Sequence, residues 1–198
     1  IISVNSSSVF VEIDKYIDHW RDMSFSYAAV KQLEGKYLVQ NRVTGEIYES
    51  PQQLYALVGM CLFQEYEEKA RMDIVKRFYD AASLFKISLP TPIMAGVRTP
   101  TRQFSSCVLI ETDDDLDSIS AASGAIVKYV SQRAGIGING GRIRAIGSPI
   151  RGGEATHTGC IPFYKHFHTA VKSCSQGGVR GGAASLFYPL WHLEVESL

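Results

Sequence analysis

Glycine is distributed unevenly along this chain of 198 residues: twelve of its 17 glycines lie between Gly135 and Gly182. Backbone with so much glycine is typical of segments that turn tightly or let another group approach closely. From residue 88 onward, short strand patterns alternate with helical patterns, which is typical of an α/β layer or barrel. The sequence therefore predicts an α/β fold, with a change of organisation between residues 1–87 and residues 88–198.

Residues 1–87 are predicted to be mainly helical, with one small hairpin where two β-prone runs flank a Thr-Gly turn in residues 38–48. Ser50 followed by Pro51 is typical of a helix start, with serine as the N-cap and proline as the first helical residue. A second helix is predicted at about residues 67–85, because apolar side chains recur there at helical spacing.

Residues 88–198 are predicted to alternate strands with helices. The strands are expected at residues 104–111, 135–143 and 185–190, and the helices at residues 113–132 and from about 162 to 173. Residues 192–198 look like the start of a further helix without a stop signal, and Ile1 is not an initiator Met. We therefore expect the chain to be an internal fragment of a longer protein.

Composition excludes several classes of protein. The formal net charge is +0, so no overall field attracts the chain to nucleic acid or to a membrane, and any anion site must be local. No apolar run approaches the roughly 18 residues of a membrane span, and no signal peptide opens the chain. The four cysteines lack CxxC spacing, which argues against a secreted disulfide scaffold and favours the cytoplasm.

Cys107 lies in a run rich in β-branched residues, at residues 104–111, which we expect to form a buried strand. A free cysteine is most often a small buried apolar side chain. However, the hydroxyls of Ser106 beside it and of Thr91 upstream could hold a polar substrate near the thiol. The residues alone leave both interpretations open.

Three glycine motifs were considered as nucleotide sites. The string from Gly135 to Gly140 matches GxGxxG, but it follows a predicted helix and leads into a strand, the reverse of a dinucleotide site, so we reject it. No GxxxxGK[ST] string occurs, which excludes a P-loop. Residues 176–182 place four glycines around Arg180, which favours a loop that changes shape with a bound ligand over a plain turn.

A metal site was considered at His157, Cys160, His166 and His168, because imidazole and thiolate are the usual zinc donors. His166 and His168 are two residues apart on a predicted helix and point to different faces. The pattern therefore favours ordinary polar residues of a helix, and we assign no metal.

Asp113, Asp114 and Asp115 open a predicted helix, where acids commonly cap free amides and meet the positive end of the helix dipole. Alternatively, one of them caps the helix while its neighbour accepts a hydrogen bond from a ribose hydroxyl. Arg144 and Arg151 flank a turn, and a guanidinium group matches phosphate oxygens bidentately. Arginines beside a loop can equally be solvated, so this point also stays open.

These residues together carry a family resemblance. The segments that carry it are residues 89–94, 104–111, 134–143, 147–153, 160–165 and 174–182. From about residue 14 to its end, the chain resembles the large, catalytic subunit of class I aerobic ribonucleotide reductases of the bacterial and phage type. The resemblance implies a ten-stranded α/β barrel after a helical region, and this chain would hold part of the helical region and the first half of the barrel.

The resemblance also implies an activity. The family reduces ribonucleoside diphosphates to deoxyribonucleotides: a thiyl radical takes the 3′ hydrogen of the ribose, the 2′ hydroxyl leaves as water, and a cysteine pair supplies the reducing equivalents. By motif, Cys107 matches one member of that pair. Thr91, Ser106 and Gly135 match positions that hold the substrate together with Cys107.

A regulatory site follows from the same resemblance. Asp114, Asp115 and Leu116 match a specificity site for a deoxynucleoside triphosphate or ATP, which we expect to bind with Mg²⁺. Arg144 and Arg151 match the arginines that contact its phosphates. The loop that relays the effector's identity to the substrate is matched by residues 174–182, including Gln176 and Arg180.

Other parts of the family's machinery find no match in this sequence. The radical cysteine, the partner of Cys107 and an assisting carboxylate would lie beyond residue 198, and Cys61, Cys160 and Cys174 do not match them. We therefore expect the chain alone to be inactive and to bind no cofactor of its own. The expected partners are a second copy of the subunit, a smaller radical-generating subunit with a metal-radical cofactor, and thioredoxin or glutaredoxin. The alternative is a non-catalytic nucleotide-binding module or one piece of a split enzyme.

Overall fold

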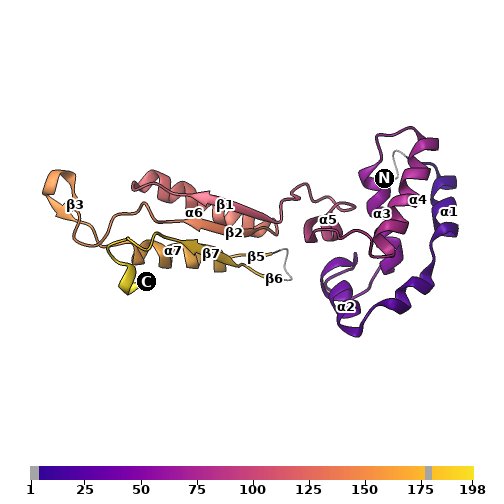
Figure 1. Cartoon of the computed structure of the whole chain (residues 1–198), viewed down its shortest axis with the longest axis horizontal. Helices are drawn as coiled ribbons and strands as arrows, with labels where there is room; N and C mark the ends of the chain where they lie inside the picture. The colour runs from indigo at the N-terminus through magenta and orange to yellow at the C-terminus, as the bar shows by residue number, and fades with distance from the viewer. Residues whose placement is uncertain (1–4, 177–179) are drawn as a thin grey trace. The chain divides into compact units, whose positions relative to one another are not determined.

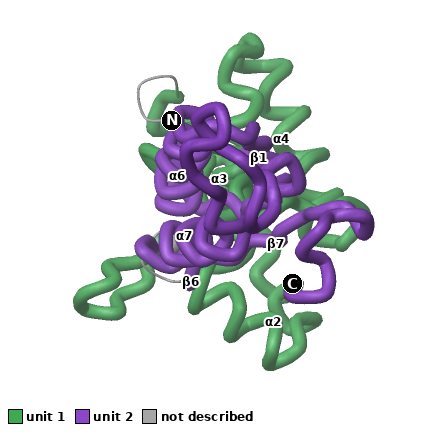
Figure 2. Tube along the Cα trace, turned by 90° about the vertical axis from the view of Figure 1, so that its left-hand side faces the viewer, with its two compact units in different colours: residues 1–104 green, residues 105–198 purple. Residues whose placement is uncertain are grey.

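The computed structural model describes residues 5–176 and 180–198. It divides into two compact units, Ile1–Phe104 and Ser105–Leu198, which Figure 2 colours green and purple. The first unit is mainly helical and the second contains both helices and strands (Figure 1). Among the described residues, no helix is both long enough and apolar enough to span a membrane.

Unit 1, the residues up to Phe104, consists of helices joined by turns and by longer irregular segments such as residues 38–50. Its elements are α1 (Ser7–Tyr16), η1 (His19–Ser24), α2 (Tyr27–Gln32), η2 (Leu33–Tyr37), α3 (Pro51–Leu62), α4 (Glu68–Ser83) and α5 (Thr91–Gly96). Helices α3 and α4 pack against each other around Leu54, Val58 and Val75, none of which is exposed to solvent. The prediction of a mainly helical first region is confirmed.

The predicted start of α3 is confirmed in detail. Ser50 Oγ accepts a hydrogen bond from the Gln53 amide at 3.2 Å, and Gln53 Oε1 accepts one from the Ser50 amide at 2.9 Å, which forms a capping box. The hairpin predicted in residues 38–48 is reduced to a single antiparallel bridge between Gln40 and Ile47.

The division between the units falls after Phe104, whereas the sequence pattern changes at residue 88. The reason is that residues just after 88 pack on the first core. Ile93 of α5 lies against that core, and the buried Arg98 side chain pairs with Glu49, donating to Glu49 Oε2 at 2.7 Å. Tertiary contacts therefore hold this segment in unit 1, although its sequence pattern resembles that of the second half.

Unit 2, the residues from Ser105 onward, contains a parallel sheet with helices on one face. Its elements are β1 (Cys107–Glu111), α6 (Leu116–Ser131), β2 (Gly135–Asn139), β3 (Pro149–Ile150), η3 (Arg151–Gly153), β4 (Ala155–Thr156), α7 (Ile161–Lys172), β5 (Ser175–Gln176), β6 (Arg180–Gly181), β7 (Ala184–Phe187) and η4 (Val195–Ser197). The three predicted strands are present but shorter than expected. The helix expected at residues 192–198 is wrong, because this segment forms turns and the short 3₁₀ helix η4.

The sheet runs in the order β1-β2-β7, with all strands parallel. Alternate side chains of a strand point to opposite faces. Ile110, Ile138 and Leu186 lie on one face and pack with α6 and α7 in the second core. On the other face Leu109 is 82% exposed and Phe187 is 55% exposed. We call this second face the open face.

Parallel strands with helices on only one side are what one part of an α/β barrel looks like. The fold is therefore a helical region followed by the start of a barrel domain, as the sequence predicted.

Candidate functional site

Cys107 is the first residue of β1, and its thiol lies on the open face of the sheet. Its partner across the ladder is Gly135, where an added Cβ would lie 3.4 Å from Cys107 Sγ. The expectation that Cys107 is buried is wrong, because the side chain is exposed. The helices cover only the face to which Val108 and Ile110 point, so the alternation of β1 leaves the thiol accessible.

The thiol of Cys107 lines a hollow of about 360 Å³ on the open face. Gly137, Ser185 and Phe187 also line it. The exposed hydroxyl-bearing Ser185 was missed by the sequence analysis. The register Gly137↔Ser185 places Ser185 on the face of Cys107, and this register cannot be read from the sequence because the two strands are far apart in the chain.

Three of the four predicted substrate residues lie together. The carbonyl oxygen of Ser106 accepts a hydrogen bond from the Gly135 amide at 2.9 Å, next to Cys107. The fourth, Thr91, is the first residue of α5 in unit 1, where its exposed hydroxyl lies 3.3 Å from the hydroxyl of Tyr37. The arrangement in unit 2 presents a thiol beside closely approaching backbone, which can face a small polar substrate.

The acidic residues before α6 have separate partners. Asp115 is the N-cap, and its Oδ1 accepts a hydrogen bond from the Ser118 amide at 2.8 Å. Asp114 does not cap the helix: its Oδ1 accepts a hydrogen bond from the Arg144 amide at 2.9 Å, and its carboxylate also pairs with the Arg144 guanidinium. Leu116, the first residue of α6, is 71% exposed. The predicted capping role is therefore confirmed for Asp115, whereas Asp114 pairs with an arginine; the alternative of a ribose contact stays a prediction.

Arg151 lies at the turn of a hairpin formed by β3 and β4, and Arg144 lies in the segment that leads into β3. The Arg144 guanidinium also donates to the carbonyl oxygen of Pro149 at 2.9 Å, so this side chain is held on both sides. Arg151 is exposed and has a positive φ of 50°, at the turn where Gly152 and Gly153 also have positive φ. The hairpin and the segment before it thus carry one arginine that is held and one that is exposed to solvent, and both guanidinium groups suit phosphate oxygens.

The predicted ligand-responsive loop is described only in part. Gln176 and Arg180 pair through their backbones across the antiparallel strands β5 and β6. Residues 177–179 lie outside the described residues, so the prediction that this loop changes shape stays a prediction.

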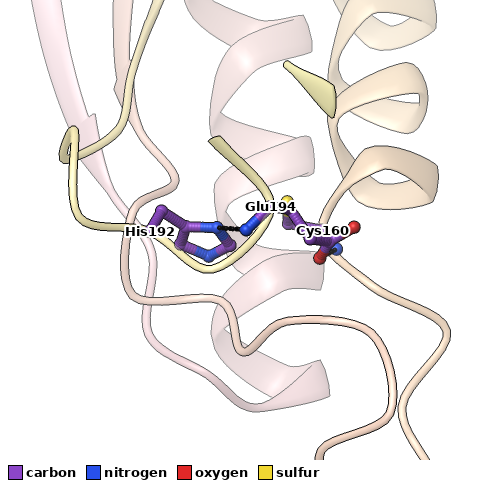
Figure 3. Close-up of side chains that lie close together, drawn as sticks. All are labelled: Cys160, His192 and Glu194. Carbon is purple, nitrogen blue, oxygen red and sulfur yellow. Dashed lines mark hydrogen bonds between the residues drawn. The ribbon is translucent and has the colours of Figure 1, made fainter. Parts of the chain in front are cut away.

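A buried cluster of three polar side chains lies at the start of α7, and the sequence analysis found only one of its members. Cys160, His192 and Glu194 place a thiol, an imidazole and a carboxylate within 4.8 Å of one another (Figure 3). All three side chains are buried. His192 and Glu194 were missed because they are far from Cys160 in the chain and no spacing pattern connects them.

These donor types suit zinc, but the hydrogen bonds of the cluster already use the atoms a metal would need. His192 Nε2 donates to the carbonyl oxygen of Ile143 at 2.8 Å, and its Nδ1 accepts from the Glu194 amide at 3.2 Å. Glu194 Oε2 accepts hydrogen bonds from two backbone amides. With both ring nitrogens engaged, the geometry fits a hydrogen-bonded cluster better than a metal centre.

The cluster shifts the pKa of two of its groups. Burial, followed by the hydrogen bond to Glu194, raises the pKa of the Cys160 thiol to about 11. Burial acts to raise the pKa of the Glu194 carboxyl, but the amides of Cys160 and Ile146 outweigh it and the net pKa is lowered. At neutral pH the cluster therefore holds a neutral thiol beside a carboxylate.

Comparisons with known proteins match both units. A family described as "Ribonucleotide reductase, all-alpha domain" matches residues 23–102, and one described as "Ribonucleotide reductase, barrel domain" matches residues 105–198. The subunit alpha of ribonucleoside-diphosphate reductase 1 from Escherichia coli is 81% identical over 189 residues, which is 96% of this chain. Subunits alpha from Haemophilus influenzae and from Enterobacteria phage T4 are 80% and 59% identical, over 94% and 100% of the chain. The chain spans about a quarter of the length of these relatives.

Proposed function

The chain belongs to the family of ribonucleotide reductase large subunits, and on that premise we propose that it forms part of the catalytic subunit that reduces ribonucleoside diphosphates to deoxyribonucleoside diphosphates. The observation that carries this proposal is the exposed thiol of Cys107 on the open face, beside Ser106 and Gly135. The matches do not favour the alternative of a non-catalytic nucleotide-binding module.

In the proposed reaction, Cys107 is one of two cysteines that reduce the ribose. The two thiols give up two hydrogens and become a disulfide; one hydrogen leaves with the 2′ hydroxyl as water, and the other replaces that hydroxyl on the sugar. A dithiol protein such as thioredoxin or glutaredoxin then restores the thiols by exchange. An accessible thiol is needed for both steps, and the exposure of Cys107 supports this role.

The residues at the start of α6, together with Arg144 and the β3–β4 hairpin, are proposed to bind a nucleoside triphosphate that selects the substrate. Arg144 and Arg151 would contact its phosphates, and Asp114, Asp115 and Leu116 would lie near its nucleoside. The pairing of Asp114 with Arg144 supports this proposal, since it brings an acidic and a basic member of the set together. We expect Mg²⁺ to accompany the triphosphate.

The remaining partners belong to the same proposal. The catalytic subunit would act in the cytoplasm as a homodimer with the effector between its copies. A smaller subunit with a metal-radical cofactor would generate the radical on a cysteine that this sequence does not contain. The 81% identity to a protein named subunit alpha supports the expectation that the chain works with a partner subunit, without specifying that partner.

The test uses a chimeric subunit, defined as the Escherichia coli relative in which the matched 189 residues are replaced by those of this chain. The chimeric subunit is expected to reduce a ribonucleoside diphosphate when the radical-generating subunit and a dithiol reductant are added. Cys107→Ser should abolish this turnover, because the serine hydroxyl cannot form a disulfide. Cys61→Ser, at a half-buried cysteine of α3, is the control and should retain it. Full turnover by the Cys107→Ser variant would overturn the proposal.

A further inference from the structure

The carboxylate of Glu194 joins the two ends of the segment that carries both arginines. We call residues 144–159 the arginine loop. Glu194 Oε2 accepts a hydrogen bond from the Ile146 amide at 3.0 Å, near the start of the loop, and from the Cys160 amide at 2.9 Å, just after its end. Glu194 itself comes from a later part of the chain, after β7. A single buried side chain thus closes the base of the loop.

His192, two residues before Glu194, holds the same base of the loop. Its Nε2 donates to the carbonyl oxygen of Ile143 at 2.8 Å, and its Nδ1 accepts a hydrogen bond from the Glu194 amide at 3.2 Å. Ile143 and Ala145 are buried at this point. The ring therefore orients the backbone of Glu194, as Figure 3 shows, and anchors through Ile143 the backbone that enters the arginine loop.

Gly159, at the end of the arginine loop, leaves room for the carboxylate of Glu194. Gly159 has a positive φ of 97°, which favours glycine. A Cβ added there would lie 2.6 Å from Glu194 Oε1. The close approach of carboxylate and loop thus depends on a glycine as well as on the two accepted hydrogen bonds.

The loop is ordered internally, and its further contacts among the described residues include the His157 ring stacked on Phe163 of α7. The Gly147 amide donates to the carbonyl oxygen of His157 at 2.9 Å, and the His157 amide donates to that of Ser148 at 2.8 Å. Arg144 is attached separately through Asp114. Among the residues that the structure describes, none attaches the Arg151 side chain in this way, and Arg151 lies at the exposed tip of the hairpin. The Arg144 guanidinium also donates to the carbonyl oxygen of Pro149, so this contact and the base of the loop together set where Arg151 lies relative to Arg144.

We propose that Glu194, supported by His192, is a positioning residue for effector binding: it holds the arginine loop so that Arg144 and Arg151 can engage one triphosphate. This inference rests on the proposed function of the two arginines. The physical reason is preorganisation, because two cations that must bind one phosphate chain lose less entropy on binding when their separation is already set. Without Glu194, the buried Cys160 amide and the part-buried Ile146 amide would also lack this acceptor.

The experiment measures dTTP binding to the chimeric subunit and the rate of substrate reduction at increasing dTTP. Glu194→Ala should weaken dTTP binding by about 10-fold, the scale of losing acceptors for two amides. The rate at saturating dTTP should stay that of the parent, because the variant changes how often the loop is correctly placed and not the chemistry. A merely structural defect would instead lower the rate at saturation, and that result would overturn the inference.

Matched variants make the test specific. Glu194→Gln keeps an oxygen that can accept both amides and should restore affinity to within about 2-fold. Glu196→Ala, at an exposed acid two residues later, should bind dTTP like the parent. Should Glu194→Ala fail to fold, Glu194→Asp decides instead, because its shorter side chain cannot reach both amides. Parental affinity in that variant would overturn the inference.

Arg151→Ala separates this inference from the proposed function. Parental dTTP affinity in Arg151→Ala would show that the arginines are not the effector site, and both proposals would fall. Weaker binding by Arg151→Ala together with parental binding by Glu194→Ala would leave the effector site standing and overturn only the positioning role of Glu194.

Discussion

The two units place their charged side chains differently. In unit 1, the Glu49 and Arg98 side chains pair in the interior, with 4% and 2% of their surface exposed. In unit 2, Arg142 pairs with Glu111 and Asp113, and all three side chains are more than half exposed. A buried pair is isolated from ligands and ties segments together, whereas exposed charges remain available to bind. The comparison indicates that the Glu49–Arg98 pair of unit 1 serves the structure, whereas the exposed charges around Arg142 and Arg151 of unit 2 remain available for recognition.

The strongest test of this comparison is removal of one arginine from each unit. Arg98→Ala should destabilise the chain by about 3–5 kcal/mol, because it leaves the Glu49 carboxylate buried without its partner. Arg142→Ala should leave the urea midpoint unchanged within error, because its pairs are solvated. The measurement is urea unfolding followed by circular dichroism. Equal losses in the two variants would contradict the comparison.

The next test asks whether the charges of unit 2 serve binding. Arg151→Ala in the chimeric subunit should weaken dTTP binding by about 1.5–3 kcal/mol, the scale of a lost charged hydrogen bond. Its unfolding midpoint should not change, because the side chain is exposed. Equilibrium dTTP binding and urea unfolding, measured on the same preparation, check the two expectations. A lowered unfolding midpoint with parental dTTP affinity would show that Arg151 serves the structure and not binding.

A contrast between buried and exposed surroundings also exists within unit 2, between the covered side of the sheet and its open face. A Cβ added at Gly182 would lie 2.1 Å from the carbonyl oxygen of Val171, on the covered side, where the backbone of α7 must move. Gly182→Ala should therefore cost about 1–3 kcal/mol. At Gly137, on the open face, the nearest atom is the end of the exposed Leu109 side chain. Gly137→Ala should cost less in the same unfolding experiment, since that side chain can turn aside; a larger cost there would contradict the picture of an open face.

The smallest expected effect concerns two thiols of unit 2. Cys107 is exposed and should react with iodoacetamide in the native chain at pH 8, whereas Cys160 is buried and should not. The pKa of Cys160 is raised to about 11 from 9.0, so between these values the unfolded thiol loses its proton while the folded one keeps it. Stability contributed by this group is therefore complete below pH 9 and is lost as pH rises towards 11.

Mass spectrometry of the labelled chain distinguishes the thiols, and melting temperatures across this pH range test the linkage. The Cys160→Ala variant should lack the part of the stability loss between pH 9 and pH 11 that Cys160 causes in the parent. Labelling of Cys160 before Cys107 at pH 8 would contradict the assigned burial.

Local rules predicted much of the fold and part of the site. Ser50 and Pro51 began a helix as expected, and Asp115 capped α6, because both depend on side chains within one turn of the chain. The rejection of the GxGxxG string was also correct in structural terms, since Gly135 and Gly137 lie within strand β2 itself. Family membership was visible for the same reason: its motifs are short segments of consecutive residues.

The sequence by itself determined the order of helices and strands, the caps that begin them and the family whose motifs they carry, because these depend on neighbours along the chain. Only the tertiary structure decided that Cys107 faces outward, that Asp114 meets Arg144, and that Glu194 reaches the ends of the arginine loop. The orientation of Cys107 depends on which face of the sheet the helices cover, and the other two contacts join residues that lie at least one whole helix apart in the chain. Such distances are set by how the elements pack, and no local preference of the residues encodes them.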